Sequence, residues 1–363
     1  MNNRIQNIFA SQKEKVDCIL IKNSDAPFID DNFFYVTGLD KGLFENSVAI
    51  LYPDSNLKLI VSELELETAK KAKAEIKFYK NTKEYKEILN NSISCFKTVG
   101  LNYKELSHKD FYELKNVFPK INFLDVSESF QKSRLIKDKD EIKLIIESCR
   151  ISDKVMKKIP EILNVKMKEY ELAAEIDYLM QRNGADKSAF ETISSFGKNS
   201  SEPHYSHGNN ILKKGDFVLC DFGACFKKYN SDITRTFVFG KASNKQREIH
   251  KIVLEAQKIG FETIKPGLKA CDVHKKVNSF IDSTNYKGRF IHSTGHSLGL
   301  SVHDGDLRLG SDCKLELKEN MVFTIEPGIY LPGYGGIRIE DDVLIKKEKI
   351  EVLTKSPRGL IEI

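Results

Sequence analysis

Short runs of hydrophobic residues, separated by polar and turn-forming segments, fill the first 130 residues and predict an α/β domain. Runs rich in β-branched residues predict strands at Val16 to Ile21, Ser47 to Tyr52, Leu57 to Val61 and Lys97 to Leu101. Between them, Glu63 to Ala74 and Thr82 to Asn90 have the pattern of helices. The turn-forming residues 53–56 predict a hairpin that joins the second strand to the third.

A charged stretch from Ser127 to Asp140 ends this domain, and we place the boundary between residues 130 and 131. Beyond it, hydrophobic residues recur at helical spacing after Asp140 and in the segments Met167 to Arg182, Lys245 to Ile264 and Ala270 to Asp282. Strand-like runs occupy Phe190 to Phe196, Phe217 to Phe222, Thr234 to Phe239, Val322 to Ile325 and Ile337 to Ile345. Residues 131–363 are therefore predicted to form an α+β domain with helices packed on a largely antiparallel sheet.

Composition narrows the function classes. The 363 residues are 40% hydrophobic and 30% charged, which is typical of a soluble globular protein. No hydrophobic run is long enough to predict a membrane span, and the N-terminal residues lack the hydrophobic core of a secretory signal, so we expect a cytoplasmic protein. The net charge of +5 comes from dispersed residues, which argues against nucleic-acid binding. Seven cysteines without a C-x-x-C pair indicate reduced thiols and no thiolate zinc site.

Two carboxylates interrupt strand-like segments of the second domain. Side chains alternate along a strand, so Asp221 shares a face with Phe217 and Leu219, and Asp232 shares one with Thr234. Both acids are therefore expected where hydrophobic residues belong, and a buried ionised carboxylate needs a cation or hydrogen bonds. A shared metal explains the pair, and two structural aspartates at strand ends explain it equally well.

Three further metal-ligand side chains occur downstream in the same kind of setting. His296 lies in H-S-T-G-H-S-L-G-L and Glu326 in V-F-T-I-E-P-G-I-Y. Glu340 lies in G-G-I-R-I-E-D-D-V, where strand alternation predicts that it shares a face with Arg338 and Asp342. Four clustered carboxylates would repel one another unless divalent cations neutralised them. Oxygen ligands with one imidazole suit manganese, cobalt or ferrous iron, and a pair of such ions supports hydrolysis.

The segments around these five residues, in the order Asp, Asp, His, Glu, Glu, resemble the pita-bread metallopeptidases of the Xaa-Pro dipeptidase (prolidase) and Xaa-Pro aminopeptidase family. The resemblance extends from about Arg134 to Ile345. The N-terminal segment resembles the smaller, creatinase-like domain of that family, and Asn32 to Gly38, N-F-F-Y-V-T-G, resembles its N-x-x-Y-L-T-G turn. The implied fold is a pita-bread catalytic domain preceded by a smaller α/β domain.

The resemblance also implies roles for individual residues. Two divalent ions per subunit, manganese or cobalt with iron or zinc as alternatives, are expected to be held by Asp221, Asp232, His296, Glu326 and Glu340. Asp232 and Glu340 would bridge the ions, and Glu326 would also exchange a proton with the attacking water. The implied reaction is hydrolysis of the Xaa-Pro bond in small proline-containing peptides, and the implied assembly is a homodimer.

Three histidines have further implied roles in this family. His204, in E-P-H-Y, matches a catalytic histidine that assists the leaving group. His303, in S-V-H-D, matches a second one, which contacts the substrate carbonyl. His292 matches an active-site histidine expected to bind substrate. His207 matches none of these positions, and we expect it at the surface.

Dipeptidases and aminopeptidases differ in whether they bind the substrate's terminal carboxylate. Arg308 lies where prolidase-like enzymes place a carboxylate-binding arginine, although a surface arginine explains it equally well. Arg338 is a second substrate-binding candidate, and its position near Glu340 equally suggests that it orients the ligands. The compact length favours the dipeptidase. An Xaa-Pro aminopeptidase is the main alternative, followed by a methionine aminopeptidase and a pita-bread binding module without catalytic activity.

Overall fold

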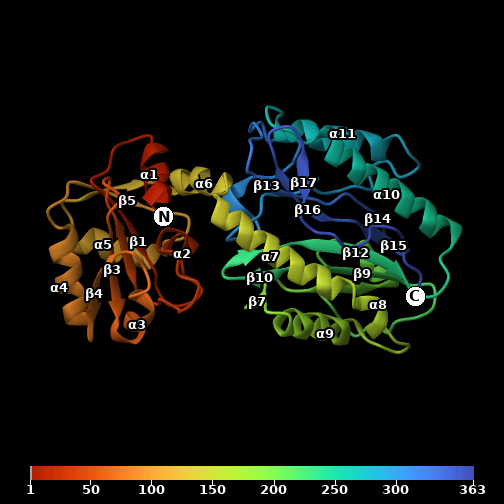
Figure 1. Cartoon of the computed structure of the whole chain (residues 1–363), viewed down its shortest axis with the longest axis horizontal. Coiled ribbons are helices and arrows are strands. Elements are labelled where there is room, and N and C mark those ends of the chain that lie inside the picture. The colour runs from red at the N-terminus through yellow and green to blue at the C-terminus, as the bar shows by residue number, and fades with distance from the viewer. Residues whose placement is uncertain (1) are drawn as a thin grey trace. The chain divides into compact units, whose positions relative to one another are not determined.

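The computed structural model describes residues 2–363, with the side chains of residues 2 and 306 left aside. The chain divides into two compact units, one that ends at Arg134 and one that runs from Leu135 to Ile363 (Figure 1). Each unit has its own hydrophobic core.

The first unit is built on a six-stranded mixed sheet in the order β4-β3-β2-β1-β5-β6. Its strands are β1 (Cys18–Lys22), β2 (Val48–Leu51), β3 (Leu57–Ser62), β4 (Glu75–Tyr79), β5 (Thr98–Leu101) and β6 (Asn122–Asp125). Its helices are α1 (Asn2–Ala10), α2 (Asp31–Thr37), the 3-10 turn η1 (Glu63–Glu65), α3 (Leu66–Ala69), α4 (Thr82–Ile93), α5 (His108–Val117) and α6 (Ser127–Leu135), which ends at the boundary. The predicted hairpin is present, because β2 and β3 pair antiparallel.

Two local predictions for this unit were wrong. The helix predicted from Glu63 to Ala74 is only a 3-10 turn followed by the four-residue α3, and β4 begins after a turn at residues 70–74. β4 was not predicted because it is an edge strand that pairs only with β3 and keeps most of its side chains partly exposed, so its hydrophobic pattern is weak. The predicted turn from Asn32 to Gly38 is mostly the helix α2, which Gly38 ends with a left-handed backbone at φ 70°.

The second unit contains small antiparallel sheets and four longer helices. Its helices are α7 (Lys139–Met156), α8 (Ile159–Ile162), α9 (Glu169–Arg182), α10 (Asn244–Thr263) and α11 (Ala270–Asp282), with 3-10 turns η2 (Gly197–Ser201) and η3 (Asp304–Asp306). Its first strands are β7 (Lys187–Ser188), β8 (Ile193–Phe196), β9 (Phe217–Phe222), β10 (Ala224–Phe226), β11 (Tyr229–Asn230) and β12 (Ile233–Val238). Those nearer the C-terminus are β13 (Val322–Ile325), β14 (Gly328–Leu331), β15 (Gly335–Arg338), β16 (Asp341–Ile345) and β17 (Ile350–Val352).

Helices cover both sides of these strands (Figure 1). On one side, α7 and α9 pack against β8, β9 and β12 through a core that includes Val155, Ile176 and Phe237. On the other side, α10 and α11 pack against β9, β14 and β15 through a core that includes Val253 and Ile337. The α+β fold predicted from the sequence is confirmed, and the strand pairs of this unit are antiparallel among the described residues.

The continuous strand predicted from Ile337 to Ile345 was wrong in one respect that matters for the site. The chain leaves β15 after Arg338 and enters β16 at Asp341, so Ile339 and Glu340 lie in a break between two different sheets. Strand alternation had predicted that Arg338, Glu340 and Asp342 share one strand face. Because of the break, they do not. The break is held open by hydrogen bonds from the Glu340 N–H to the Thr234 carbonyl (3.1 Å) and from the Ile339 N–H to the Pro327 carbonyl (3.4 Å).

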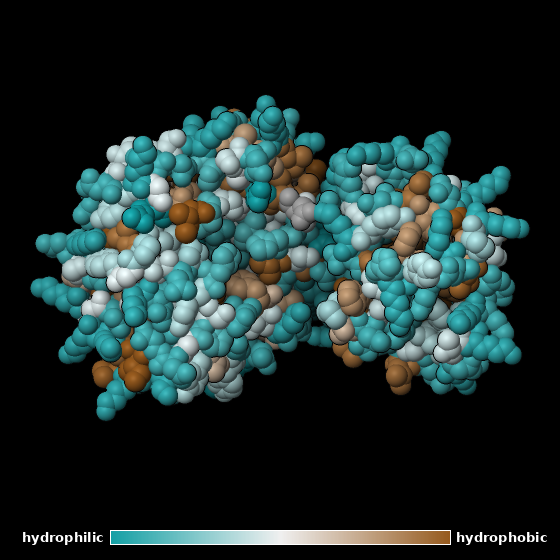
Figure 2. Space-filling view, turned by 180° about the vertical axis from the view of Figure 1, so that it is seen from behind, coloured by the Kyte–Doolittle hydropathy of each residue, from teal (hydrophilic) through white to brown (hydrophobic). Residues whose placement is uncertain are grey.

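The surface is mainly hydrophilic, and hydrophobic residues appear on the visible face in small separate groups (Figure 2). Among residues 2–363, none of the helices combines the length and hydrophobicity that a membrane crossing requires. All seven cysteines are free, and Cys220 is buried in the core between α7, α9 and the sheet.

Candidate metal centre and substrate cavity

The antiparallel pair β9 and β12 brings the first two acidic residues to one place. Asp221 on β9 lies opposite Thr234 on β12, and Asp232 directly precedes β12. The Asp232 N–H donates to the Asp342 carboxylate (2.9 Å), which fixes the backbone where β12 begins. Asp221 and Asp232 are buried, at 7% and 4% exposure, so both carboxylates do lie where hydrophobic side chains would be expected.

His296 reaches the same place from a neighbouring segment. Its Nε2 atom lies 3.5 Å from Asp232 Oδ2 and 3.7 Å from Glu326 Oε1, while its Nδ1 atom faces the Ser297 carbonyl at 3.3 Å. Burial lowers the pKa of His296 to about 3, with a smaller contribution from His303, so the ring is neutral. A neutral ring that donates from Nδ1 leaves the Nε2 lone pair directed at the carboxylates, as a metal ligand requires.

A close backbone contact explains the glycine before this histidine. The His296 N–H donates to Thr324 Oγ1 (3.1 Å) and the Thr324 N–H donates to the His296 carbonyl (2.9 Å). A Cβ atom at Gly295 would lie 1.9 Å from the Thr324 carbonyl oxygen. Only glycine therefore allows this segment to lie against β13 at Thr324, which is two residues before Glu326.

The two glutamates are positioned by backbone and threonine contacts. Glu326 follows β13, and its N–H donates to the Thr294 carbonyl (2.8 Å). Glu340 lies in the break before β16, and Thr234 Oγ1 donates to its Oε2 atom (2.5 Å). Ligand atoms of Asp232, His296 and Glu340 all lie within 4.8 Å of one another.

The donor set fits divalent cations. Burial and neighbouring carboxylates raise the pKa of the Asp232 and Glu340 carboxyls well above their usual range. Burial also raises the pKa of Glu326 to about 8, although the Arg338 guanidinium opposes the rise. Within the described chain, Asp221 Oδ1 and Asp232 Oδ1 are buried without a hydrogen-bond partner. Buried acceptors without donors are rare, and cations of oxygen-rich sites would satisfy both oxygens and stabilise the charged carboxylates.

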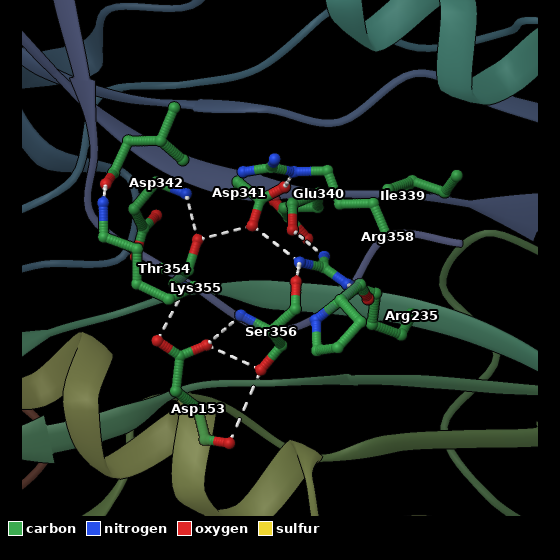
Figure 3. Close-up of polar contacts among 12 residues, drawn as sticks. Asp153, Arg235, Ile339, Glu340, Asp341, Asp342, Thr354, Lys355, Ser356 and Arg358 are labelled. Atoms are coloured by element: carbon green, nitrogen blue, oxygen red, sulfur yellow. Dashed lines mark hydrogen bonds and ion pairs between the residues drawn. The ribbon is translucent and has the colours of Figure 1, made fainter. Parts of the chain in front are cut away.

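A buried polar network behind Glu340 holds this part of the chain (Figure 3). Arg235 donates to the Glu340 carbonyl (2.6 Å), to Asp341 (2.7 Å) and to the Ser356 carbonyl (2.8 Å). Arg358 donates to the other oxygen of Asp341 (2.6 Å). Figure 3 shows that these groups converge from β12, β16 and the C-terminal segment. The backbone of Glu340 is therefore tied to residues far away in the sequence.

A second network links the ligands to a histidine. Arg338 donates to Asp221, to Thr234 Oγ1 (3.1 Å) and to the Tyr330 hydroxyl (2.7 Å). The Tyr330 hydroxyl lies 2.9 Å from His292 Nε2, and the Ser293 carbonyl lies 2.8 Å from His292 Nδ1. Tyr330 was missed by the sequence reasoning, although it ends the T-I-E-P-G-I-Y segment that had already been singled out.

All ten residues predicted for the site line one cavity of about 990 Å³, namely His204, Asp221, Asp232, His292, His296, His303, Arg308, Glu326, Arg338 and Glu340. The His303 ring lies 4.2 Å from the His296 ring. The backbone of Arg308 pairs with that of His296 in an isolated antiparallel β-bridge. The Arg308 guanidinium is exposed and forms an ion pair with Asp312 (2.7 Å). His207 is outside the cavity lining, partly buried, with Nδ1 3.1 Å from the Thr192 carbonyl.

Family comparisons identify both units. Residues 143–347 match the model of metallopeptidase family M24, and residues 3–136 match the creatinase/prolidase N-terminal domain. The chain belongs to metallopeptidase family M24. As an M24 metallopeptidase it is an enzyme with the pita-bread fold, as the sequence motifs implied.

Relatives within the M24 family resemble this chain over nearly its whole length. The Xaa-Pro dipeptidase of Pyrococcus furiosus is 42% identical over 86% of this chain and 88% of its own, and that of Pyrococcus horikoshii is 38% identical over 99% of both. The solved prolidase from Pyrococcus horikoshii OT3 superposes with a TM-score of 0.90 at 36% identity, covering 99% of this chain and 100% of its own. The X-Pro aminopeptidase from Thermotoga maritima also gives 0.90, at 31% identity, covering 96% and 98%.

Proposed function

We propose that this M24 metallopeptidase hydrolyses the bond between an N-terminal residue and proline, with Xaa-Pro dipeptides as its main substrates. The observation that carries the proposal is the single cavity into which the carboxylates, four histidines and an exposed arginine converge. The similarity to archaeal Xaa-Pro dipeptidases over nearly the full chain supports it.

Two divalent ions would be held by Asp221, Asp232, His296, Glu326 and Glu340. Manganese or cobalt suits this oxygen-rich set best, and iron or zinc is an alternative. When bound, such a pair lowers the pKa of a shared water and polarises the substrate carbonyl.

The protein's own groups then handle protons and orientation. Glu326 accepts the proton of the attacking water on its carboxylate, which lies beside His296 at 3.7 Å. His303, adjacent to His296 in the cavity, donates a hydrogen bond to the substrate carbonyl oxygen as charge develops there. His204, an exposed residue of the cavity lining, assists departure of the proline nitrogen. His292 orients the substrate from the far end of the Tyr330 network.

Arg308 and Arg338 have different proposed tasks. The exposed guanidinium of Arg308 can leave Asp312 and bind the terminal carboxylate of a dipeptide with two parallel hydrogen bonds. Arg338 is 3% exposed and donates to Asp221, Thr234 and Tyr330, so we propose that it positions a metal ligand and does not bind substrate directly.

A second candidate function is Xaa-Pro aminopeptidase activity on longer peptides. The observation that favours it is the pairing of Arg308 with Asp312, which neutralises the group that a dipeptide carboxylate would need. The X-Pro aminopeptidase from Thermotoga maritima, with a TM-score equal to that of the Pyrococcus horikoshii prolidase, is consistent with this alternative.

The homodimer and the cytoplasmic location stay predictions. Light scattering of the purified protein would measure the mass of the assembly against the chain mass of 41.4 kDa.

The deciding experiment compares Xaa-Pro with Xaa-Pro-Xaa peptides that share their first residue. Metal-stripped protein is assayed with and without added manganese or cobalt. We expect metal-dependent cleavage of the dipeptide, and loss of that preference in Arg308→Ala. Faster cleavage of the tripeptide would assign the aminopeptidase, and cleavage of neither would reject the substrate class. Met-Ala peptides serve as the control for methionine aminopeptidase activity.

A further inference from the structure

We propose that Glu169, a buried carboxylate outside the cavity lining, is a positioning residue that sets the place of His204. The inference rests on the proposed function, because it takes His204 to assist the departing proline nitrogen. Glu169 is the first residue of α9 and is 0% exposed, yet its side chain faces donors from the segment that carries His204.

Four donor groups converge on this one carboxylate. The Phe196 N–H donates to Oε1 (2.7 Å), and the Gly208 N–H donates to Oε2 (3.1 Å). The Tyr205 hydroxyl donates to Oε2 (2.8 Å), and the Asn199 side-chain amide reaches both oxygens (3.0 and 3.3 Å). A buried ionised carboxylate is stable only when compensated in this way, so the loop residues 196–208 are bound to α9 through one side chain.

The same loop also docks against the first turn of α9 through its backbone. The Tyr170 N–H donates to the Gly208 carbonyl (3.2 Å), and the Glu169 N–H donates to the Asn210 carbonyl (3.2 Å). A Cβ atom at Gly208 would lie 2.5 Å from the Tyr205 hydroxyl and 3.3 Å from Glu169 Oε2. The phenol, the carboxylate and this backbone are therefore packed too closely for the phenol to shift freely.

His204 lies between two fixed points of this loop. The Tyr205 N–H donates to the Glu202 carbonyl (3.1 Å), which closes a turn with His204 near its tip. On one side of His204, the Pro203 carbonyl accepts from Arg338 (3.3 Å); on the other, the Tyr205 side chain is held by Glu169. His204 itself is exposed, so its position in the cavity depends on these neighbours.

The two anchors can be separated by experiment. Arg338 also donates to Asp221, so a change there would disturb the metal ligands as well as the turn. Glu169 has no hydrogen bond to any of the five proposed ligands among the described residues, and the hydrogen bonds that its side chain accepts all come from residues 196–208. Replacing Glu169 therefore loosens the His204 turn and leaves the ligand set intact.

A double-mutant cycle on the metal-loaded enzyme tests the proposal with an Xaa-Pro dipeptide as substrate. Glu169→Gln keeps the side-chain size but places an amide N–H₂ where N–H and O–H donors converge. We expect kcat to fall 10- to 100-fold with KM within about threefold, because His204 acts on the departing nitrogen. In a His204→Ala background, the same change should lower kcat less than threefold.

Two further variants keep the test interpretable. Tyr205→Phe removes one donor and leaves three around the carboxylate, so it should fold and lower kcat 3- to 10-fold, again only when His204 is present. Glu175→Gln, on the exposed face of the same helix, should match wild type. Equal losses with and without His204, or no loss in either Glu169→Gln or Tyr205→Phe, would overturn the proposal. Failure of the proposed function is distinguishable, because wild-type enzyme would then leave the dipeptide uncleaved.

Discussion

Asp341→Asn should destabilise the second unit strongly, although it changes only one atom of the side chain. Asp341 is 0% exposed, and its Oδ1 atom accepts from Arg235 (2.7 Å) and Thr354 (2.7 Å). Its Oδ2 atom accepts from Gln257 (2.9 Å) and Arg358 (2.6 Å). Asparagine replaces one of these oxygens with an N–H₂ group, which would face two donors whichever way the amide is turned.

The expected loss of unfolding free energy depends on which orientation of the asparagine amide is less unfavourable. Arg235 has no room to reach water, since its side chain is 4% exposed, whereas that of Arg358 is 32% exposed and can turn outward. The amide should therefore direct its oxygen at Arg235 and lose the bonds to Gln257 and Arg358. Removing one partner of a buried ion pair costs roughly 3–5 kcal/mol, and the retained bond to Arg235 favours the lower end, about 3 kcal/mol.

Urea unfolding followed by circular dichroism measures this loss of unfolding free energy. The matched control is Asp272→Asn on α11, an exposed carboxylate 3.9 Å from Lys275, which should change stability by less than about 0.5 kcal/mol. The Asp341→Asn variant should also lose activity, because Gln257, which would lose its bond to Asp341, also donates to the Ile339 carbonyl beside Glu340 (3.2 Å). A stability within 1 kcal/mol of wild type would mean that Asp341 does not need all four of its hydrogen bonds to stay buried.

Four other outcomes follow from the structure. Burial lowers the pKa of His250 to about 4 from an ordinary value of 6.5, so His250 in the unfolded chain binds a proton first as pH falls. The free energy of unfolding should therefore be unaffected above pH 6.5 and fall by about 3 kcal/mol by pH 4. Urea unfolding of His250→Gln should lack this fall. Lys137→Met removes the ammonium group that lies 2.8 Å from the buried Asp304 carboxylate and should lower the free energy of unfolding by roughly 3–5 kcal/mol in the same assay. An unchanged urea midpoint would show that this ion pair does not stabilise the fold. Gly295→Ala forces a backbone shift on β13 and should lower the free energy of unfolding by about 1–3 kcal/mol. It should also abolish most metal-dependent activity. The control Gly359→Ala, which has open space around it, should leave both unchanged. With each free ion kept at about 100 times its dissociation constant, removing the metals should cost about 2.7 kcal/mol for each ion bound. This should lower Tm by roughly 5–10 °C for each ion, a fall that manganese reverses and that a protein without a metal site would not show.

The sequence predicted most of the fold because its elements carry strong local signals. The helix Ala270–Asp282 and the strands Phe217–Phe222 and Val322–Ile325 have the bounds that their hydrophobic patterns indicated. The edge strand β4 was missed because one neighbour and exposed side chains leave little pattern to read.

The residues that line the cavity could be selected from the sequence, but their arrangement could not. Asp232 and Glu340 were recognisable because a carboxylate in a hydrophobic run is unusual. The break at Glu340 was not, because it depends on Arg235 and on backbone bonds to β12, which are contacts between distant segments. Tyr330 and Glu169 were missed for the same reason, since a tyrosine in a strand and a glutamate at a helix start are ordinary in sequence.

We propose that a pair of divalent ions in this cavity enables cleavage of the Xaa-Pro bond. The most direct test titrates manganese into metal-stripped protein and follows hydrolysis of an Xaa-Pro dipeptide against metal bound per chain. We expect no cleavage without metal and a rise in activity that ends at two ions per chain, with Asp232→Asn inactive at every metal concentration. Full activity in the stripped protein, or activity that is complete at one ion, would contradict the two-metal site.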